Sequence, residues 1–243
     1  MISKEVVLDV LTGVRDPELD EPVTTLGFVS DVEIFDGSVR VWLRLPTYFC
    51  APNFSYLMVE DSREAILSLP GVRGAEVMLD GHHASGEINA GVEDERGFDS
   101  SFTGETSGEA LDGVRATFRR KAFVRRQEML CRVLMSGGAK PQDLARMTLS
   151  DVPDSPESDV YRERRIELGI DVSANAPLIV DPDGRRVPED AVVEHLKFAR
   201  LTRVSVEGNA AHCLGLLAAR YGTPEGTPEG TLEGIPEMEE ARL

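Results

Sequence analysis

The stretch LPTYFCAPNF, residues 45–54, places Cys50 between a strand-like apolar run and a proline that can open a helix. The partial positive charge at a helix N-terminus stabilises a thiolate, which can bind a metal or react with an electrophile. Free cysteine is also among the most buried residue types, so a small core side chain is the alternative. Cys50, Cys131 and Cys213 lie far apart, without a CxxC pair or zinc-type spacing. We therefore expect neither a disulfide framework nor a structural zinc site.

The remaining thiol and imidazole groups are weaker candidates. His212 and Cys213 are adjacent, and neighbouring side chains on a helix diverge by about 100°, which argues against a joint role. His82 and His83 could catch a metal adventitiously, and Cys131 is interpreted as a packed side chain. The sequence contains no phosphate-binding loop, dinucleotide-binding glycine pattern or Ser-His-Asp order.

The bulk composition limits the class of protein. The 243 residues carry a formal net charge of −17, with 41% hydrophobic and 28% charged residues, as in globular proteins. The negative charge argues against nucleic acid as a partner, because that binding needs Lys and Arg to neutralise phosphates. No apolar run approaches the roughly 20 residues of a membrane span, and the N-terminus shows no leader pattern. We expect a cytoplasmic protein.

The first 80 residues are predicted to form the elements that position Cys50. Apolar residues at helical spacing, with Ser3 as the cap and Pro17 as the stop, predict a first helix. Alternating residues around Asp36-Gly37 predict a hairpin, and a helix should follow Pro52. A third strand follows in VRGAEVML. The order α-β-β-α-β indicates a small two-layer α+β domain.

The rest of the chain divides by composition. Residues 81–108 are rich in Gly, Ser, Asp and Glu and are predicted to be a flexible linker. Residues 109–220 predict a mixed, mainly helical domain, with a strand–turn–strand in PLIVDPDGRRVP and a strand before the last helix. Residues 221–243 repeat Thr-Pro-Glu-Gly and are predicted to be a disordered acidic tail.

The first helix of the second domain is predicted to be strongly basic. Two interpretations stay open: a solvated face balanced by nearby acidic segments, or a docking surface for an acidic partner, which would make this a client-docking domain. The basic residues are Arg115, Arg119, Arg120, Lys121, Arg125, Arg126 and Arg132.

Several short motifs of the first 80 residues occur in the order and spacing of a known family. They are DPE at residues 16–18, LGFV at 26–29, the DG turn, the cysteine after the second strand, and LPGV at 69–72. In this third of the chain the sequence resembles the iron–sulfur cluster assembly domain of bacterial SufT and PaaD proteins and of the eukaryotic cytosolic targeting factor. One departure is that Thr47 is followed by only two residues before Cys50, and Ala51 separates that cysteine from Pro52.

The resemblance implies a role for Cys50 as a transient contact to iron or to an iron–sulfur cluster, near the acidic DPE turn. Asp16 or Glu18 could then supply an oxygen ligand, although Asp-Pro-Glu is also an ordinary helix-end turn. One cysteine cannot hold a cluster, which usually needs four ligands. The cluster would be shared across a homodimer or with a client metalloprotein or the assembly machinery.

Three functions follow as hypotheses. The leading one is an accessory factor, not an enzyme, for iron–sulfur cluster assembly or metalloprotein maturation. The second is an adaptor or assembly chaperone for a multicomponent diiron monooxygenase, in which Cys50 is structural. The third, an enzyme with Cys50 as nucleophile, ranks lowest, because no histidine lies in the predicted N-terminal domain to serve as its base.

Overall fold

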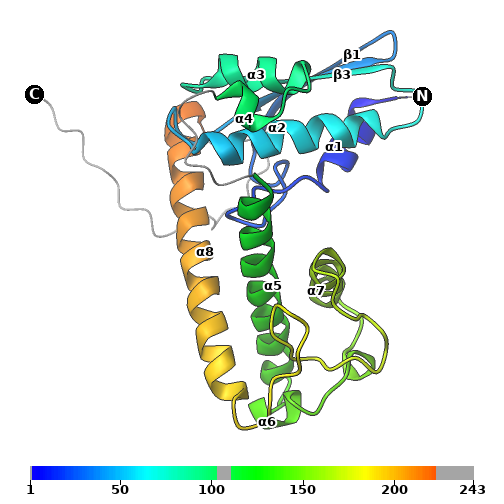
Figure 1. The fold of residues 1–243 in the computed structure, drawn as a ribbon, viewed down its shortest axis with the longest axis vertical. Helices are drawn as coiled ribbons and strands as arrows, with labels where there is room; N and C mark the ends of the chain where they lie inside the picture. Colours follow the sequence, from blue (N-terminus) through cyan, green and yellow to red (C-terminus); the bar gives the residue numbers. More distant parts are fainter. Residues whose placement is uncertain (1, 103–110, 223–243) are drawn as a thin grey trace, which may run out of the picture. The chain divides into compact units, whose positions relative to one another are not determined.

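The computed structural model describes residues 2–102 and 111–222 (Figure 1). The chain divides into two compact units. The described part of the N-terminal unit comprises residues 2–102 and 208–222, and that of the helical unit comprises residues 111–207. The predicted second domain therefore ends too late, because residues 208–220 group with the N-terminal unit. The predicted acidic tail lies, from residue 223 on, outside the described residues.

The sheet of the N-terminal unit confirms the predicted hairpin and third strand. Strands β1 (Val29–Phe35) and β2 (Ser38–Arg44) are antiparallel, joined by Asp36 and Gly37, which both have positive φ. This is the backbone that a tight two-residue turn requires, and it explains the Asp-Gly pair. Strand β3 (Gly74–Asp80) pairs in parallel with β2, so the order is β1-β2-β3.

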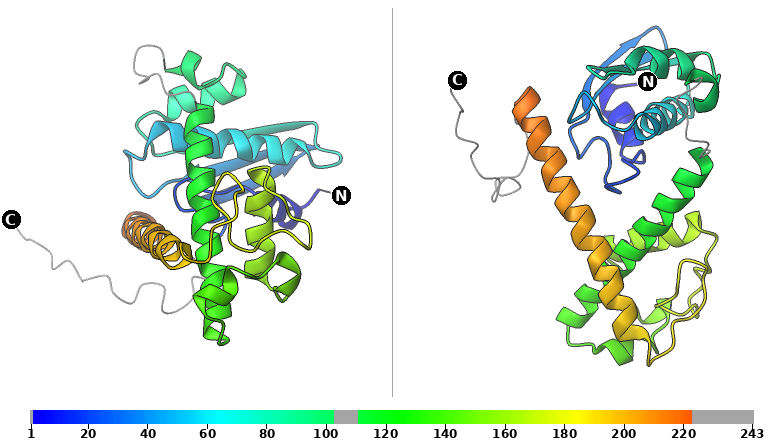
Figure 2. Two further views of the ribbon diagram at one scale, coloured as in Figure 1. Left: turned by 60° about the horizontal axis from the view of Figure 1, so that its bottom comes forward. Right: turned by 60° about the vertical axis from the view of Figure 1, so that its left-hand side comes forward.

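Parallel pairing of β2 with β3 requires a crossover, and α2 (Pro52–Leu67) supplies it. The helix packs against β3 and lies along the sheet (Figure 2). Its fully buried side chains include Tyr56, Leu57, Val59 and Ile66. The predicted α-β-β-α-β order and two-layer α+β class are thus confirmed.

The first helix is shorter than its apolar spacing predicts. Helix α1 (Lys4–Leu11) begins at Ser3, whose Oγ accepts a hydrogen bond from the Val6 N–H at 3.4 Å. It ends at Leu11 rather than at Pro17. Val14 is nevertheless buried, since the chain after the helix folds back through a hydrogen bond from the Val23 N–H to the Val14 carbonyl.

The prediction of a flexible linker over residues 81–108 is wrong for residues 85–101. These form α3 (Ser85–Glu93) and α4 (Phe98–Ser101). The physical reason is that Ile88 and Val92 give this polar segment a buried apolar face. Gly91 permits the close approach of the two helices, since a Cβ there would lie 2.8 Å from that of Ser101.

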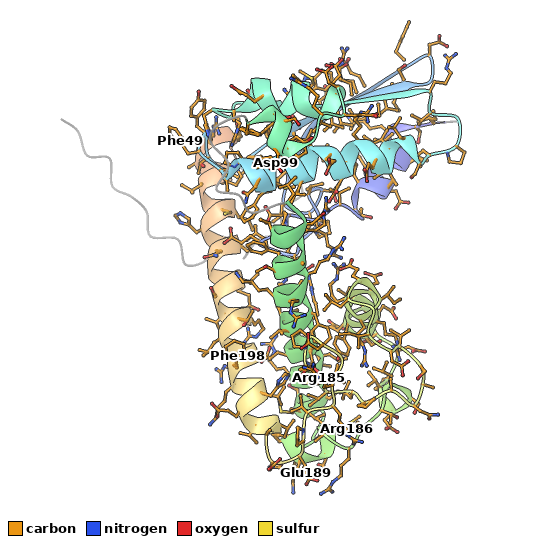
Figure 3. The ribbon with its side chains drawn as sticks, in the orientation of Figure 1. Phe49, Asp99, Arg185, Arg186, Glu189 and Phe198 are labelled. Carbon is orange, nitrogen blue, oxygen red and sulfur yellow. The ribbon has the colours of Figure 1, made fainter. Side chains whose placement is uncertain are left out.

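The helical unit contains α5 (Leu111–Ser136), α6 (Pro141–Leu144), a 3-10 turn (Leu149–Asp151), α7 (Pro156–Glu167) and the first half of α8 (Val192–Tyr221). Figure 3 labels Arg186 and Glu189 in the loop before α8, where Arg146 pairs with Glu189. The predicted mainly helical character is confirmed. Its apolar core includes Phe123, Leu130, Cys131, Leu144, Tyr161, Leu178, Val180 and Val192.

Two predicted strand regions of the helical unit are wrong. Residues 177–188 form a turn with isolated bridges only, Val180 to Arg186 and Pro177 to Thr148, and no strands. The backbone of Val180 is instead hydrogen-bonded to the side chain of Gln127. The strand predicted before the last helix is absent because residues 192–221 form one continuous helix, α8.

The basic residues of α5 do not form one uniform face. Arg125 is only 5% exposed, whereas Arg119, Arg120, Lys121 and Arg132 are exposed. Arg120 forms an ion pair with Asp183 at 2.6 Å. In the residues that the structure describes, no helix combines the length and the apolar character needed to cross a membrane.

Candidate functional site

Cys50 lies in the loop between β2 and α2, immediately before the N-cap Ala51, and Pro52 is the first helical residue. The predicted helix start is thus confirmed. The side chain is half-buried, with Sγ 3.4 Å from Thr47 Oγ1. Because Thr47 Oγ1 accepts a hydrogen bond from the Phe49 N–H at 3.2 Å, its own proton is free to point at the sulfur. The short Thr-to-Cys spacing therefore still brings the hydroxyl to the thiol.

His82 fixes the backbone of Cys50. Its Nε2 donates a hydrogen bond to the Cys50 carbonyl at 2.7 Å, and its Nδ1 accepts one from the Ala84 N–H at 3.1 Å. The ring is only 3% exposed, and burial lowers its pKa from the ordinary value of 6.5. Both contacts require the neutral ring with its proton on Nε2. His82 is thus a positioning group rather than the adventitious metal ligand considered from the sequence.

An exposed aromatic group borders the thiol. Tyr48 and Phe49 are 49% and 76% exposed, and their ring centroids lie 5.0 Å apart. His83 Nδ1 donates a hydrogen bond to the Tyr48 carbonyl at 3.0 Å, and its ring lies 5.6 Å from that of Phe49. Figure 3 labels Phe49 at this end of the N-terminal unit. Cys50 therefore lies beside a surface that offers aromatic contact to another molecule.

Asp16 holds the acidic DPE turn together. Its Oδ1 accepts hydrogen bonds from the backbone N–H groups of Glu18 at 2.9 Å and Leu19 at 2.8 Å. The carboxyl group is 8% exposed, and this burial, partly offset by the two hydrogen bonds, raises its pKa from 3.8 to about 6. The geometry gives Asp16 a structural role in the turn. Glu18 is half-buried, and its Oε1 accepts a hydrogen bond from Asn209 Nδ2 at 3.1 Å.

The raised pKa of Asp16 makes the stability of the N-terminal unit depend on pH. Between the unfolded value of 3.8 and the folded value of about 6, the folded state binds more protons, so stability falls as pH rises. Asp16→Asn keeps both hydrogen bonds without the charge. We expect it to raise the free energy of unfolding at pH 7 by up to about 3 kcal/mol, a gain that disappears near pH 4.

Urea unfolding at both pH values, followed by the fluorescence of Trp42 in β2, measures this difference. Asp9→Asn, at an exposed carboxylate of α1, is the matched control and should change little. A less stable Asp16→Asn variant at pH 7 would mean that the carboxylate charge itself supports the turn.

The last turns of α8 bring further groups to this site. Arg220 donates hydrogen bonds to the carbonyls of Leu45 at 3.3 Å and Gly81 at 2.6 Å, whereas Asn209 bonds Glu18. At 100° per residue, Asn209, Cys213 and Arg220 lie within about 40° of one another around the helix. Cys213 is therefore on the helix face that packs against the loops carrying Glu18 and Cys50.

Sequence spacing did not predict that Cys213 lies near Cys50 and the acidic turn. Burial raises the pKa of its thiol to about 11, and the nearby Asp16, Cys50 and Glu18 raise it further. The residues at 16, 18, 50 and 213 thus share one electrostatic environment. Spacing along the chain could not reveal this, because 163 positions separate the two cysteines. Cys131, by contrast, is fully buried in the helical unit, as predicted.

The set of side chains limits the chemistry of the site. Across residues 2–102 and 111–222, no group of three or more His, Cys, Asp or Glu side chains is arranged to hold a metal ion. Two thiols with carboxylates nearby can supply part of the ligand shell of a thiophilic metal. These side chains therefore supply only part of a ligand shell. A metal ion bound at Cys50 would need further ligands from another molecule.

The comparisons with known proteins concern the same domain. Residues 4–78 match the family described as iron-sulfur cluster assembly protein. The chain is 34% identical over 90 residues to the uncharacterized protein MJ1129 of Methanocaldococcus jannaschii, covering 37% of this chain and 93% of that protein. It is 39% identical over 79 residues to an iron-sulfur cluster carrier protein of Synechocystis, covering 32% of this chain but 22% of that relative. No solved structure matches significantly.

The family match begins at α1 and ends within β3, so it includes the hairpin, Cys50 and α2. The resemblance inferred from the DPE, LGFV and LPGV motifs is confirmed. Through its N-terminal domain, the chain belongs to the iron–sulfur cluster assembly protein family.

Proposed function

We propose that this protein is an accessory factor in iron–sulfur cluster assembly and in the maturation of client metalloproteins, and that Cys50 is its contact to the cargo. The observation that carries the proposal is the position of Cys50. The thiol is half-buried at the start of α2, has a hydroxyl beside it, and lies within the segment that matches the assembly family. This position leaves the sulfur accessible to cargo beside the start of a helix, where a cysteine can serve as a metal ligand.

The incomplete ligand set supports a transient role rather than permanent storage. A cluster usually needs four protein ligands, and no three-ligand group is present among the described side chains. Cargo held at Cys50 therefore keeps open positions, which an acceptor can fill. The exposed rings of Tyr48 and Phe49 beside the thiol offer a contact surface for that acceptor. The protein would act without turnover chemistry of its own, in the cytoplasm, on a client metalloprotein or with the assembly machinery.

Asp16 and Glu18 contribute differently in this proposal. Asp16 maintains the turn through its two backbone hydrogen bonds. Glu18 has one carboxylate oxygen engaged by Asn209, and its position near the thiols makes it the better candidate for an oxygen ligand. Its charge also attracts an incoming iron cation.

Anaerobic reconstitution of the full chain with ferrous iron and sulfide tests the proposal. After desalting, the unmodified protein should retain iron and sulfide, with the visible absorbance of a cluster. Cys50→Ser should retain at least about tenfold less iron, because the hydroxyl is a poor ligand for a thiophilic metal. Cys131→Ala, which removes the thiol buried in the helical unit, is the control and should behave as the unmodified protein.

Two results would contradict the proposal. One is an unmodified protein that retains no iron under these conditions. The other is equal iron retention by the unmodified protein and Cys50→Ser, which would make Cys50 a structural residue. Both results would favour the adaptor hypothesis, in which the protein organises partners without holding a cluster.

A further inference from the structure

Cys213 is a second thiol of the N-terminal unit. It lies on α8 between two anchors of that helix to the N-terminal domain. Asn209, about 6 Å before it along the axis, bonds Glu18, and Arg220, about 10 Å after it, bonds the carbonyls of Leu45 and Gly81. These three side chains share one face of the helix, so the anchors at both ends direct Cys213 toward the N-terminal domain.

Cys50 is tied to the same anchor. Arg220 donates a hydrogen bond to the Gly81 carbonyl, and the next residue, His82, donates one to the Cys50 carbonyl at 2.7 Å. The chain segment that fixes the end of α8 therefore also fixes the backbone of Cys50. Both thiols are half-buried. Neither is enclosed in a core as Cys131 is, so both keep access to a cargo from outside.

Two neighbouring thiols define the kind of bound cluster more closely than one thiol does. In a 2Fe–2S cluster with four cysteine ligands, each iron takes two thiolates. A chain that presents two cysteines from different elements can therefore hold one iron completely and leave the other iron for ligands of a second protein.

We propose that Cys213 is the second thiolate ligand of the Cys50 site, so that the two cysteines hold one iron of a 2Fe–2S cluster as a half-site. This inference rests on the proposed function and goes beyond it by assigning the ligand and the cluster type. It also gives α8 a function, because the helix supplies a ligand that residues 4–78 of the assembly domain lack.

Transfer from this half-site is a ligand exchange without oxidation or reduction. The two iron–sulfur bonds to Cys50 and Cys213 break, and two thiols of the acceptor form the new bonds. The acceptor thiols give up two protons, and the released Cys50 and Cys213 thiolates take up two. Iron and sulfide charges are unchanged, so no co-reactant is needed.

The first test compares variants of the full chain after anaerobic reconstitution with ferrous iron and sulfide. Cys213→Ser should retain at least about fivefold less cluster iron than the unmodified protein, approaching the loss in Cys50→Ser. His212→Ala, the neighbouring exposed residue of α8, is the matched control and should retain the cluster. Trp42 fluorescence of each variant checks that the N-terminal unit is folded.

The second test needs no variant and so does not depend on folding of Cys213→Ser. Iodoacetamide is added to the metal-free and reconstituted protein, and peptide mass spectrometry measures the labelling of each cysteine. We expect both Cys50 and Cys213 to be protected when the cluster is bound. If Cys50 is protected but Cys213 is labelled as fast as in the metal-free protein, this inference is wrong and the proposed function still stands. Failure of the unmodified protein to hold any cluster would overturn the proposed function itself.

Discussion

Replacing His82 by alanine is expected to lower the free energy of unfolding of the N-terminal unit by about 3 kcal/mol. The ring is 3% exposed and is hydrogen-bonded to the Cys50 carbonyl and to the Ala84 N–H. Its removal leaves both backbone groups without this partner and creates a cavity. Urea unfolding monitored by Trp42 measures the stability, and the rate of iodoacetamide labelling measures the access to Cys50, which should increase as the loop loosens.

His83→Ala is the matched control for this prediction. His83 is the adjacent residue but is exposed, and its hydrogen bond to the Tyr48 carbonyl lies at the surface. Its loss should cost less than about 1 kcal/mol. Equal effects of the two substitutions would refute the assigned positioning role of His82.

The lowered pKa of His82 also makes the stability of the N-terminal unit depend on pH, with a sign opposite to that of the Asp16 contribution. Burial lowers the pKa of His82 below 6.5 in the folded state. The unfolded state therefore binds the proton more readily, so the contribution of His82 is present above about pH 6.5 and is lost as pH falls below this value. His82→Ala should be less sensitive to pH in this range than the unmodified protein.

Replacing Gln127 by leucine is expected to destabilise the helical unit by about 4 kcal/mol. The side chain is fully buried in α5, and its amide bonds both backbone groups of Val180, through Nε2 at 3.0 Å and Oε1 at 2.9 Å. Nε2 also lies 3.1 Å from His195 Nε2, and Oε1 lies 3.2 Å from the Tyr161 hydroxyl. Leucine fills similar space but leaves the buried N–H and C=O of Val180 without these partners.

Hydrogen exchange read by mass spectrometry tests the Gln127 prediction. Peptides from α5 and α7 should exchange faster in Gln127→Leu, whereas Trp42 fluorescence reports separately on the N-terminal unit. Val133→Ala, at an exposed position of the same helix, is the control and should change the exchange little. Unchanged exchange in Gln127→Leu would show that the amide does not stabilise the helical unit.

Local sequence patterns predicted those elements whose signals lie close together in the chain. The Asp36-Gly37 turn, the strands on each side of it and the helix opened by Pro52 were all confirmed. The linker prediction failed at residues 85–101 because composition alone does not show that Ile88 and Val92 find a hydrophobic partner. The strand predictions around residue 180 failed because a distant side chain, Gln127, takes the hydrogen bonds that a strand partner would have made.

The sequence by itself determined the assembly domain and led to the prediction that Cys50 is its contact to cargo, since both depend on residues within one short, continuous segment. Only the tertiary structure decided what surrounds that thiol. It brought His82 from a predicted linker to the Cys50 backbone, and Cys213 from the last helix toward Cys50, Asp16 and Glu18. Such neighbours are selected by packing and helix anchors rather than by spacing, which is why two cysteines that are 163 positions apart in the sequence can lie near each other in the fold.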